Sequence, residues 1–288
     1  MNYFKTFILM TALLALMMLV GNLIGGSQGM MTFFLMGLAM NFVSYWFSDK
    51  IILMMSGAKP ASESELPRVY GIVKKLTAQA GLPMPKIYLM DTPILNAFAT
   101  GRNPDHSAVA VTSGILNVLD EKELTAVLGH ELSHVKNRDI LIATIAAAIA
   151  GAIMMVSRMA MWFGRGGDDR DSRSNALVML LVAILAPLAA MIIQMAISRS
   201  REYAADEGGA HLTGMPLALA GALKKLESGP KSARDGGVNP ATAHLFIVSP
   251  FRGESLVALF STHPPVPERV KRLEEMAAEM APAPGSKS

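Results

Sequence analysis

Two uncharged apolar runs dominate the start of the chain, one at residues 6–26 and the second at residues 30–47. A helix of about 20 apolar residues can cross the hydrocarbon core of a membrane. Overall, 51% of the residues are hydrophobic, 17% are charged and the mean hydropathy is +0.36, which is too apolar for an ordinary soluble protein. The sequence therefore predicts an N-terminal membrane-spanning hairpin.

The alternative for the first run is a cleaved signal peptide. Such a peptide has a shorter apolar core and is not usually followed at once by a second span. The connection at residues 22–29 carries no charge, whereas Lys50, Lys59, Arg68 and Lys74 follow the second run. Because basic residues concentrate on the cytoplasmic side of membrane proteins, both ends of the hairpin are predicted to lie in the cytoplasm.

From Lys59 onward the sequence changes to the pattern of a folded, water-exposed domain. Residues 66–76 carry an apolar stripe at helical spacing, and Gly81 is expected to end that helix. Short runs suited to strands follow, and the last two flank a turn at residues 101–104. The predicted strands are residues 86–90, 96–100 and 108–112.

The next predicted helix carries the motif H-E-x-x-H. Asp120 and the Glu three residues later have the spacing of a capping box, which places the start of this helix at Asp120. His130 and His134 then lie on one helical face, where both imidazoles can bind one metal ion. Glu131 lies one residue round from the pair, where it can hold a water at the open metal position and take its proton. The alternative is two histidines on a solvated helix face.

A third ligand is offered by Glu202. Glu202 and Asp206 are four residues apart, so one helical face presents one carboxylate to the metal and a second to the free ring nitrogen of a ligand histidine. The chain has no cysteine, which excludes thiolate ligands and leaves His, Asp and Glu. The pattern predicts one Zn²⁺ per chain, bound by His130, His134 and Glu202.

Two further apolar runs, at residues 140–157 and 176–197, separate the halves of this site. The first is rich in Ala and Gly and could equally be a buried helix of the folded domain. Because ligands of one ion lie on the same side of the membrane, this segment crosses twice or not at all. The predicted division is a transmembrane hairpin at 1–50, catalytic segments at 51–139 and 198–288, and a second apolar hairpin at 140–197.

The C-terminal part is predicted to hold an amphipathic helix around residues 217–226 and a terminal helix opened by Pro267. Between them, His263 precedes two prolines. It is either an electrophile that assists catalysis or a structural residue of a turn.

Taken together, the chain resembles the HtpX family of bacterial membrane zinc endopeptidases, which are related to the CAAX prenyl proteases. The resemblance covers nearly the full length, although no motif aligns within residues 228–239. Its parts are the paired N-terminal runs, Asn96-Ala97-Phe98-Ala99, His130-Glu131-Leu132-Ser133-His134, an apolar hairpin, Glu202-Tyr203-Ala204-Ala205-Asp206, and Ser261-Thr262-His263-Pro264-Pro265 with Arg269.

The resemblance implies a mainly α-helical membrane protein with a zincin-type α+β metalloprotease domain, whose small sheet lies beside the H-E-x-x-H helix. It implies a multi-pass protein of the bacterial inner membrane with its catalytic site facing the cytoplasm, and a stress-related role in quality control of misfolded or damaged membrane proteins. It also implies that Asn96, Ala97, Phe98 and Ala99 form a substrate-binding edge strand. From the pattern alone, ordinary sheet packing is the simpler interpretation of that strand.

Two other functions stay open at this point. Processing of one dedicated lipidated or C-terminal substrate would require a much larger intramembrane chamber. A catalytically silent membrane scaffold would gain nothing from Glu131. The net charge of +3 is mild and no basic block alternates with aromatic residues, so the expected partners are the lipid bilayer, membrane proteins and unfolded polypeptides, not nucleic acid.

Overall fold

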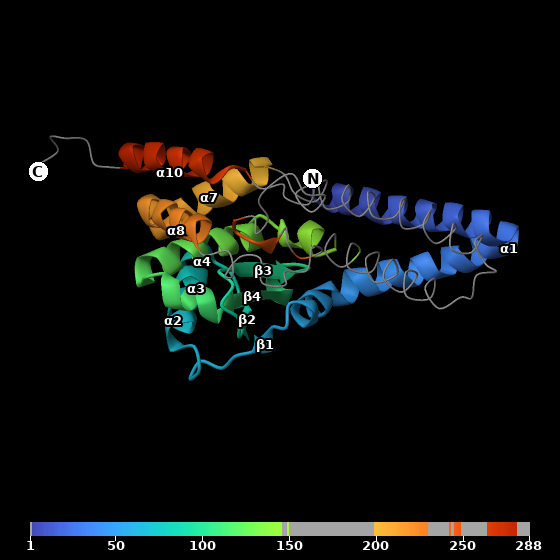
Figure 1. The fold of residues 1–288 in the computed structure, drawn as a ribbon, viewed down its shortest axis with the longest axis horizontal. Coiled ribbons are helices and arrows are strands. Elements are labelled where there is room, and N and C mark those ends of the chain that lie inside the picture. Colours follow the sequence, from blue (N-terminus) through green and yellow to red (C-terminus); the bar gives the residue numbers. More distant parts are fainter. Residues whose placement is uncertain are drawn as a thin grey trace, which may run out of the picture.

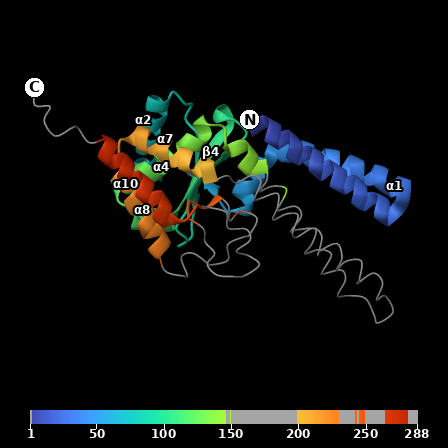
Figure 2. The same ribbon diagram turned by 90° about the horizontal axis from the view of Figure 1, so that it is seen from above.

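The computed structural model describes residues 2–145, 149, 199–229, 242, 245–248 and 264–280 of the 288-residue chain. A long apolar helical hairpin projects from a body that combines a small sheet with packed helices (Figures 1 and 2). Most of the predicted second hairpin, most of the loop at 228–239, and His263 lie outside the described residues.

Helix α1 (Asn2–Met55) folds back on itself near Gly26, whose φ of +58° suits a residue without a side chain (Figure 2). The side-chain amide of Asn41 donates a hydrogen bond to the carbonyl oxygen of Met10 across the two arms, at 3.0 Å. This contact holds residues 31 positions apart side by side, as a hairpin requires.

The two arms of α1 differ in how well they match a membrane span. The segment Gly26–Met55 is long and apolar enough to cross a membrane, and it contains the predicted run at 30–47. The first arm contains a shorter apolar helix, Thr6–Leu19. Among the described residues, one helix is therefore both long enough and apolar enough to span a membrane. The first predicted span stays a prediction.

The sheet has four strands in the order β1-β2-β4-β3, which places β3 at an edge. Strands β2 and β4 run parallel, and the other pairs are antiparallel. The three predicted strands are confirmed to within one residue. Strand β1 was not predicted, because its two residues are too few to show the alternation of apolar and polar side chains that marks a strand. The strands are β1 (Lys59–Pro60), β2 (Lys86–Met90), β3 (Ala97–Gly101) and β4 (Ser107–Thr112), with the 3₁₀ helix η1 (Pro104–His106) between β3 and β4.

Helices cover one face of the sheet, and the end of α1 covers the other. Ala97 and Ala99 of β3 pack into the core built with α2 and α4. Phe98, between them, packs on the opposite side against Ile52 and Leu53 of α1. The helices of the body are α2 (Pro67–Ala80), α3 (Ser113–Val118), α4 (Glu121–Lys136), α7 (Arg199–Thr213), α8 (Pro216–Ser228) and α10 (Val266–Met280).

The start of α4 follows the predicted capping box. The Asp120 side chain accepts a hydrogen bond from the Glu123 N–H at 2.9 Å, and the Glu123 carboxylate accepts one from the Asp120 N–H at 3.0 Å. Lys225 of α8 also binds the Glu123 carboxylate, at 2.6 Å. The cap therefore sets the beginning of the motif helix and joins it to α8.

Helices α4 and α7 form the most extensive helix–helix contact in the described part of the chain. A Cβ at Gly209 would lie 2.7 Å from the backbone nitrogen and 2.8 Å from the Cα of His130. A Cβ at Gly129 would lie 2.5 Å from the side chain of Thr213. The two backbones can approach this closely only because neither glycine has a side chain.

We expect Gly209→Ala to weaken metal binding although Gly209 offers no ligand. The added methyl group would push α7 away from α4 at the level of His130, and overpacking of this kind costs about 1–3 kcal/mol. Thermal unfolding and zinc content of the detergent-solubilised chain measure both effects.

Gly71→Ala in α2 is the matched control, because a Cβ there meets nothing within 4 Å. Alanine is favoured over glycine inside a helix by about 1 kcal/mol, so this variant should be slightly more stable. Unchanged stability and zinc content in Gly209→Ala would show that the close approach of α4 and α7 is not needed.

Candidate metal centre

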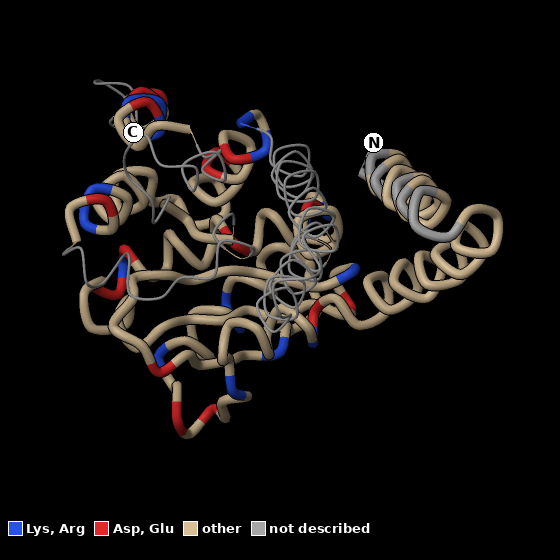
Figure 3. Tube along the Cα trace, turned by 45° about the vertical axis from the view of Figure 1, so that its right-hand side comes forward, with Lys and Arg blue, Asp and Glu red and all other residues tan. Residues whose placement is uncertain are grey.

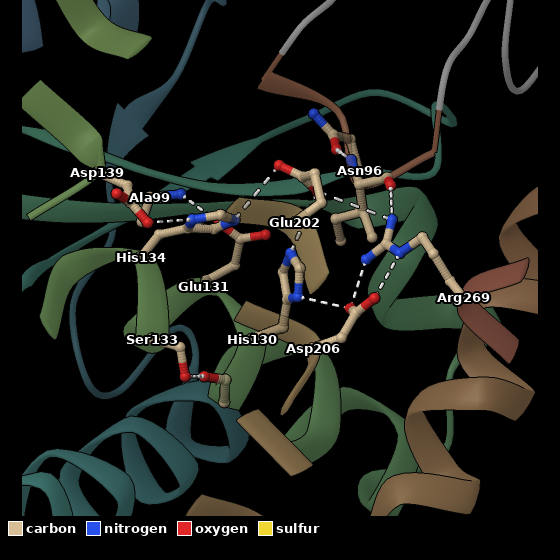
Figure 4. Close-up of polar contacts among 12 residues, drawn as sticks. Asn96, Ala99, His130, Glu131, Ser133, His134, Asp139, Glu202, Asp206 and Arg269 are labelled. Atoms are coloured by element: carbon tan, nitrogen blue, oxygen red, sulfur yellow. Dashed lines mark hydrogen bonds and ion pairs between the residues drawn. The ribbon is translucent and has the colours of Figure 1, made fainter. Parts of the chain in front are cut away.

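The side chains of His130 and His134 on α4 face Glu202 on α7 (Figure 4). One potential ligand atom from each of the three lies within 4.8 Å of the others. Glu202 oxygens are 3.9 Å from Nε2 of His130 and 3.7 Å from Nε2 of His134. These separations exceed a hydrogen bond, but they approach the roughly 3.4 Å that separates two zinc ligands at tetrahedral geometry. The residues therefore fit a shared metal ion.

The charges around the site also suit a divalent cation. Four carboxylates lie in or next to the cluster, opposed by two guanidinium groups. With neutral histidines and ionised carboxylates, two negative charges are left, which one divalent cation would balance. The carboxylates are Glu131, Asp139, Glu202 and Asp206, and the guanidinium groups are Arg201 and Arg269.

Asp206 contacts His130 from the side away from Glu202. Its Oδ1 lies 2.9 Å from Nδ1 of His130, a close contact that is not aligned as a hydrogen bond. Arg269 of α10 is fully buried and donates two hydrogen bonds to Asp206, from Nε at 2.7 Å and from Nη2 at 2.6 Å. Burial acts to raise the pKa of Asp206, but Arg269 outweighs it and holds the pKa below its usual value. A chain of contacts from Arg269 through Asp206 thus orients the His130 ring.

Asp139 plays the corresponding part for His134. Its Oδ2 lies 3.5 Å from Nδ1 of His134, and its N–H donates to the His134 carbonyl oxygen at 3.0 Å. The preceding Arg138 has φ +56°, a conformation that turns the chain back after α4. Burial lowers the pKa of His134, but the contact with Asp139 and the charges of nearby carboxylates outweigh it and raise the pKa to about 9. Metal binding would therefore compete with a proton on His134.

Glu131 is buried between the motif helix and the sheet. Its Oε2 accepts a hydrogen bond from the N–H of Ala99 in β3, at 2.8 Å. Burial raises the pKa of Glu131 above its usual value, against the opposing effect of the two histidines. A carboxylate with a raised pKa beside a metal position is a suitable general base near neutral pH.

The predicted substrate strand lies next to this carboxylate. Ala97, Phe98 and Ala99 belong to the edge strand β3, and Asn96 immediately precedes it. The Asn96 side chain accepts a hydrogen bond from the Ile247 N–H at 3.3 Å, and the Ile247 carbonyl oxygen accepts one from Arg269 Nη1 at 2.7 Å (Figure 4). The backbone of Ile247 therefore links the residue before the edge strand to α10.

Sequence reasoning did not assign a site role to Arg269 or Asp139. Arg269 was noted only as part of the resemblance, and it lies 63 residues from Asp206. One signal was present: Arg269 falls inside the apolar stripe of α10 that includes Val266, Val270 and Leu273. An arginine buried in such a stripe needs an anionic partner.

We expect Asp206→Asn to lower zinc affinity about 10- to 100-fold, as for other residues that orient a ligand histidine. The amide keeps the size of the side chain but cannot balance Arg269. Competition for zinc with a chelator measures the affinity, and thermal unfolding measures the cost of leaving Arg269 without a carboxylate.

Glu207→Gln is the matched control, because Glu207 is an exposed carboxylate on the same helix. Equal zinc affinities in the two variants would show that Asp206 does not orient His130.

Known proteins are similar to this chain over most of its length. The sequence pattern of peptidase family M48 matches residues 63–277. Relatives named "Protease HtpX homolog" include proteins from Pelotomaculum thermopropionicum, 54% identical over 96% of this chain and 100% of the relative, and from Pyrococcus furiosus, 52% identical over 96% of each.

A third relative of the same name, from Thermococcus sibiricus, is 52% identical over 96% of this chain and 97% of its own length. The crystal structure of S. mikatae Ste24p is similar with a TM-score of 0.48 and 19% identity, over 83% of this chain and 57% of that chain. The match to the family pattern covers most of the chain, and the relatives are similar over almost their whole length. The chain therefore belongs to peptidase family M48 and is a metalloprotease.

Proposed function

We propose that this protease is a membrane-bound zinc metalloendopeptidase with its catalytic site facing the cytoplasm. The observation that carries the proposal is the convergence of His130, His134 and Glu202 beside Glu131 and the edge strand β3. Three protein ligands leave a fourth position for water or substrate, which is typical of catalytic zinc sites and not of structural ones.

In the proposed reaction, His130, His134 and Glu202 would hold zinc, which would act as a Lewis acid on the scissile carbonyl and lower the pKa of a bound water. Glu131 takes the proton of the attacking water and passes it to the amide nitrogen that leaves. The Ala99 N–H holds the Glu131 carboxylate in place through its 2.8 Å hydrogen bond. An extended substrate would pair with the backbone of β3, which brings its scissile bond next to Glu131.

The proposed location follows from how α1 meets the body. Phe42 and Trp46 on the outside of α1 are 60% and 45% exposed, and such large apolar side chains are suited to contact with lipid. Farther along α1, Ile52 and Leu53 pack against Phe98 of β3. Since the helix rises about 1.5 Å per residue, the edge strand would lie close to the membrane surface. Membrane proteins with extended, damaged segments in the cytosol are therefore the proposed substrates, in a quality-control role.

We expect Glu131→Gln to retain zinc but to hydrolyse casein at least about 10²-fold more slowly, because the substitution removes proton transfer and spares the ligands. Digestion by the detergent-solubilised chain, with and without a chelator, measures the rate. Glu202→Ala is the matched variant: it should lose the metal, since two histidines seldom hold Zn²⁺ firmly. Wild-type hydrolysis in Glu131→Gln, or stoichiometric zinc in Glu202→Ala, would overturn these assignments.

Orientation in the membrane can be tested with single cysteines, because the chain has none of its own. Ser27 lies at the bend of α1 and Glu121 opens α4, and both are exposed. We expect a membrane-impermeant thiol reagent to label Ser27→Cys in intact cells and to spare Glu121→Cys. Permeabilised cells, in which both should react, provide the control. The reverse pattern would place the catalytic site outside the cytoplasm.

A further inference from the structure

A cavity of about 470 Å³ lies between the last turns of the membrane-facing part of α1 and one end of the sheet. None of its lining residues belongs to the candidate metal centre. The second arm of α1 is free of charged residues until it reaches the body, where acidic and basic residues appear together (Figure 3). We call this cavity the base pocket because it lies at the base of the α1 hairpin. Its lining consists of Phe42, Trp46, Phe47, Asp49, Lys50, Lys86, Arg102 and His106.

One wall of the base pocket is aromatic. Phe42, Trp46 and Phe47 are 60%, 45% and 42% exposed and belong to the last turns of the apolar run at 30–47. Tyr45 packs edge-on against Trp46, with ring centroids 5.5 Å apart. Tryptophan and tyrosine concentrate where the hydrocarbon core of a membrane meets the headgroups. The wall therefore marks the depth at which lipid headgroups would lie.

The other wall is cationic. The guanidinium carbon of Arg102 lies 4.6 Å from the ring centroid of Trp46, and the ammonium nitrogen of Lys50 lies 5.4 Å from that of Phe47. Lys86 is exposed at the start of β2. Within the described residues, none of these three cations forms a salt bridge, and Asp49 is the one acidic residue of the lining. The lining of the pocket thus carries more positive than negative charge, and no salt bridge within the described residues balances the excess.

We propose that the base pocket binds the headgroup of an anionic phospholipid. A phosphate group accepts charge-assisted hydrogen bonds from arginine and lysine, and basic pockets beside membrane helices bind anionic headgroups. The exposed aromatic wall gives the acyl chains an apolar surface along α1, which a free phosphate ion would not use. A zwitterionic lipid would bring a choline cation into a pocket that already has excess positive charge.

The proposal rests on the membrane attachment proposed above and adds a consequence for the catalytic domain. Lys50 belongs to α1, whereas Arg102 directly follows the edge strand β3. One headgroup bound to both residues would join the membrane helix to the strand whose Ala99 holds Glu131. The lipid would therefore help to fix the height of the catalytic site above the membrane.

The test uses the full chain in a non-ionic detergent, with Trp162→Phe as the background so that fluorescence reports on Trp46 alone. Short-chain phosphatidylglycerol, short-chain phosphatidylcholine and inorganic phosphate are titrated separately. We expect a saturable change with phosphatidylglycerol only. Lys86→Gln with Arg102→Gln should weaken that binding at least about tenfold, because each cation near an anionic lipid contributes several-fold to affinity.

Lys74→Gln with Lys75→Gln is the matched control, since it removes the same charge from exposed positions on α2. An equal loss in this control would mean that only diffuse charge matters. An equal response to inorganic phosphate would make the pocket a site for free anions, and an equal response to phosphatidylcholine would make it merely apolar. Each of these outcomes overturns the proposal.

Zinc content is measured for every variant, so that misfolding is not mistaken for loss of the lipid site. If the double variant fails to fold, Lys86→Gln alone, at an exposed position, should still weaken binding about fivefold. Casein hydrolysis and thiol labelling are measured on protein whose base pocket is unaltered. If hydrolysis and labelling give the expected results but no phosphatidylglycerol binds, only the lipid site is refuted. If hydrolysis and labelling contradict the expectation, the proposed function is refuted, and the lipid site that rests on it is refuted as well.

Discussion

The close contact between the backbones of α4 and α7 is the constraint on which the geometry of the candidate metal centre depends. At Gly129 and Gly209 the helices approach so closely that no Cβ fits at either position. One and two turns away along α7, Asp206 and Glu202 then reach the histidines of α4. A site of this kind tolerates displacements of only about 0.5 Å, so a single methyl group between the helices would be felt at the ligands.

A buried network of charges surrounds the ligands and joins distant elements to them. Arg269 is fully buried, and taking such a charge out of water is favourable only when its partners are well placed. Its two hydrogen bonds to Asp206 and its third to the Ile247 carbonyl oxygen meet that condition. Helix α10 therefore supports the candidate metal centre through Arg269, although none of its described residues is a candidate ligand.

The sheet connects this site to the apolar helix. One face of β3 packs into the core beneath α4, and the other packs against the end of α1 through Phe98. Alternation of side chains along a strand makes both contacts possible in adjacent residues. In the proposed function, the same strand would hold the base Glu131, pair with substrate and lie near the membrane, so that catalysis would be restricted to extended segments close to the lipid surface.

Local features were readable from the sequence because they depend on neighbours along the chain. The capping box at Asp120, the shared face of His130 and His134, and the three strands follow from hydrogen bonds and periods within a few residues. Glu202 was predicted as the third ligand on chemical grounds, because a chain without cysteine has His, Asp and Glu as its usual zinc ligands.

Only the tertiary structure decided which distant groups meet. No local pattern relates Arg269 to Asp206, which lies 63 residues away. The edge position of β3 follows from the strand order β1-β2-β4-β3. Asp139 reaches His134 because Arg138 has a positive φ, a backbone conformation that few residues other than glycine adopt. The reason is that packing between elements depends on shape and burial across the whole core, whereas a sequence pattern reports only the preferences of each segment. The sequence by itself determined the candidate ligands and the helix that carries two of them, and the fold decided which side chains hold those candidates in place.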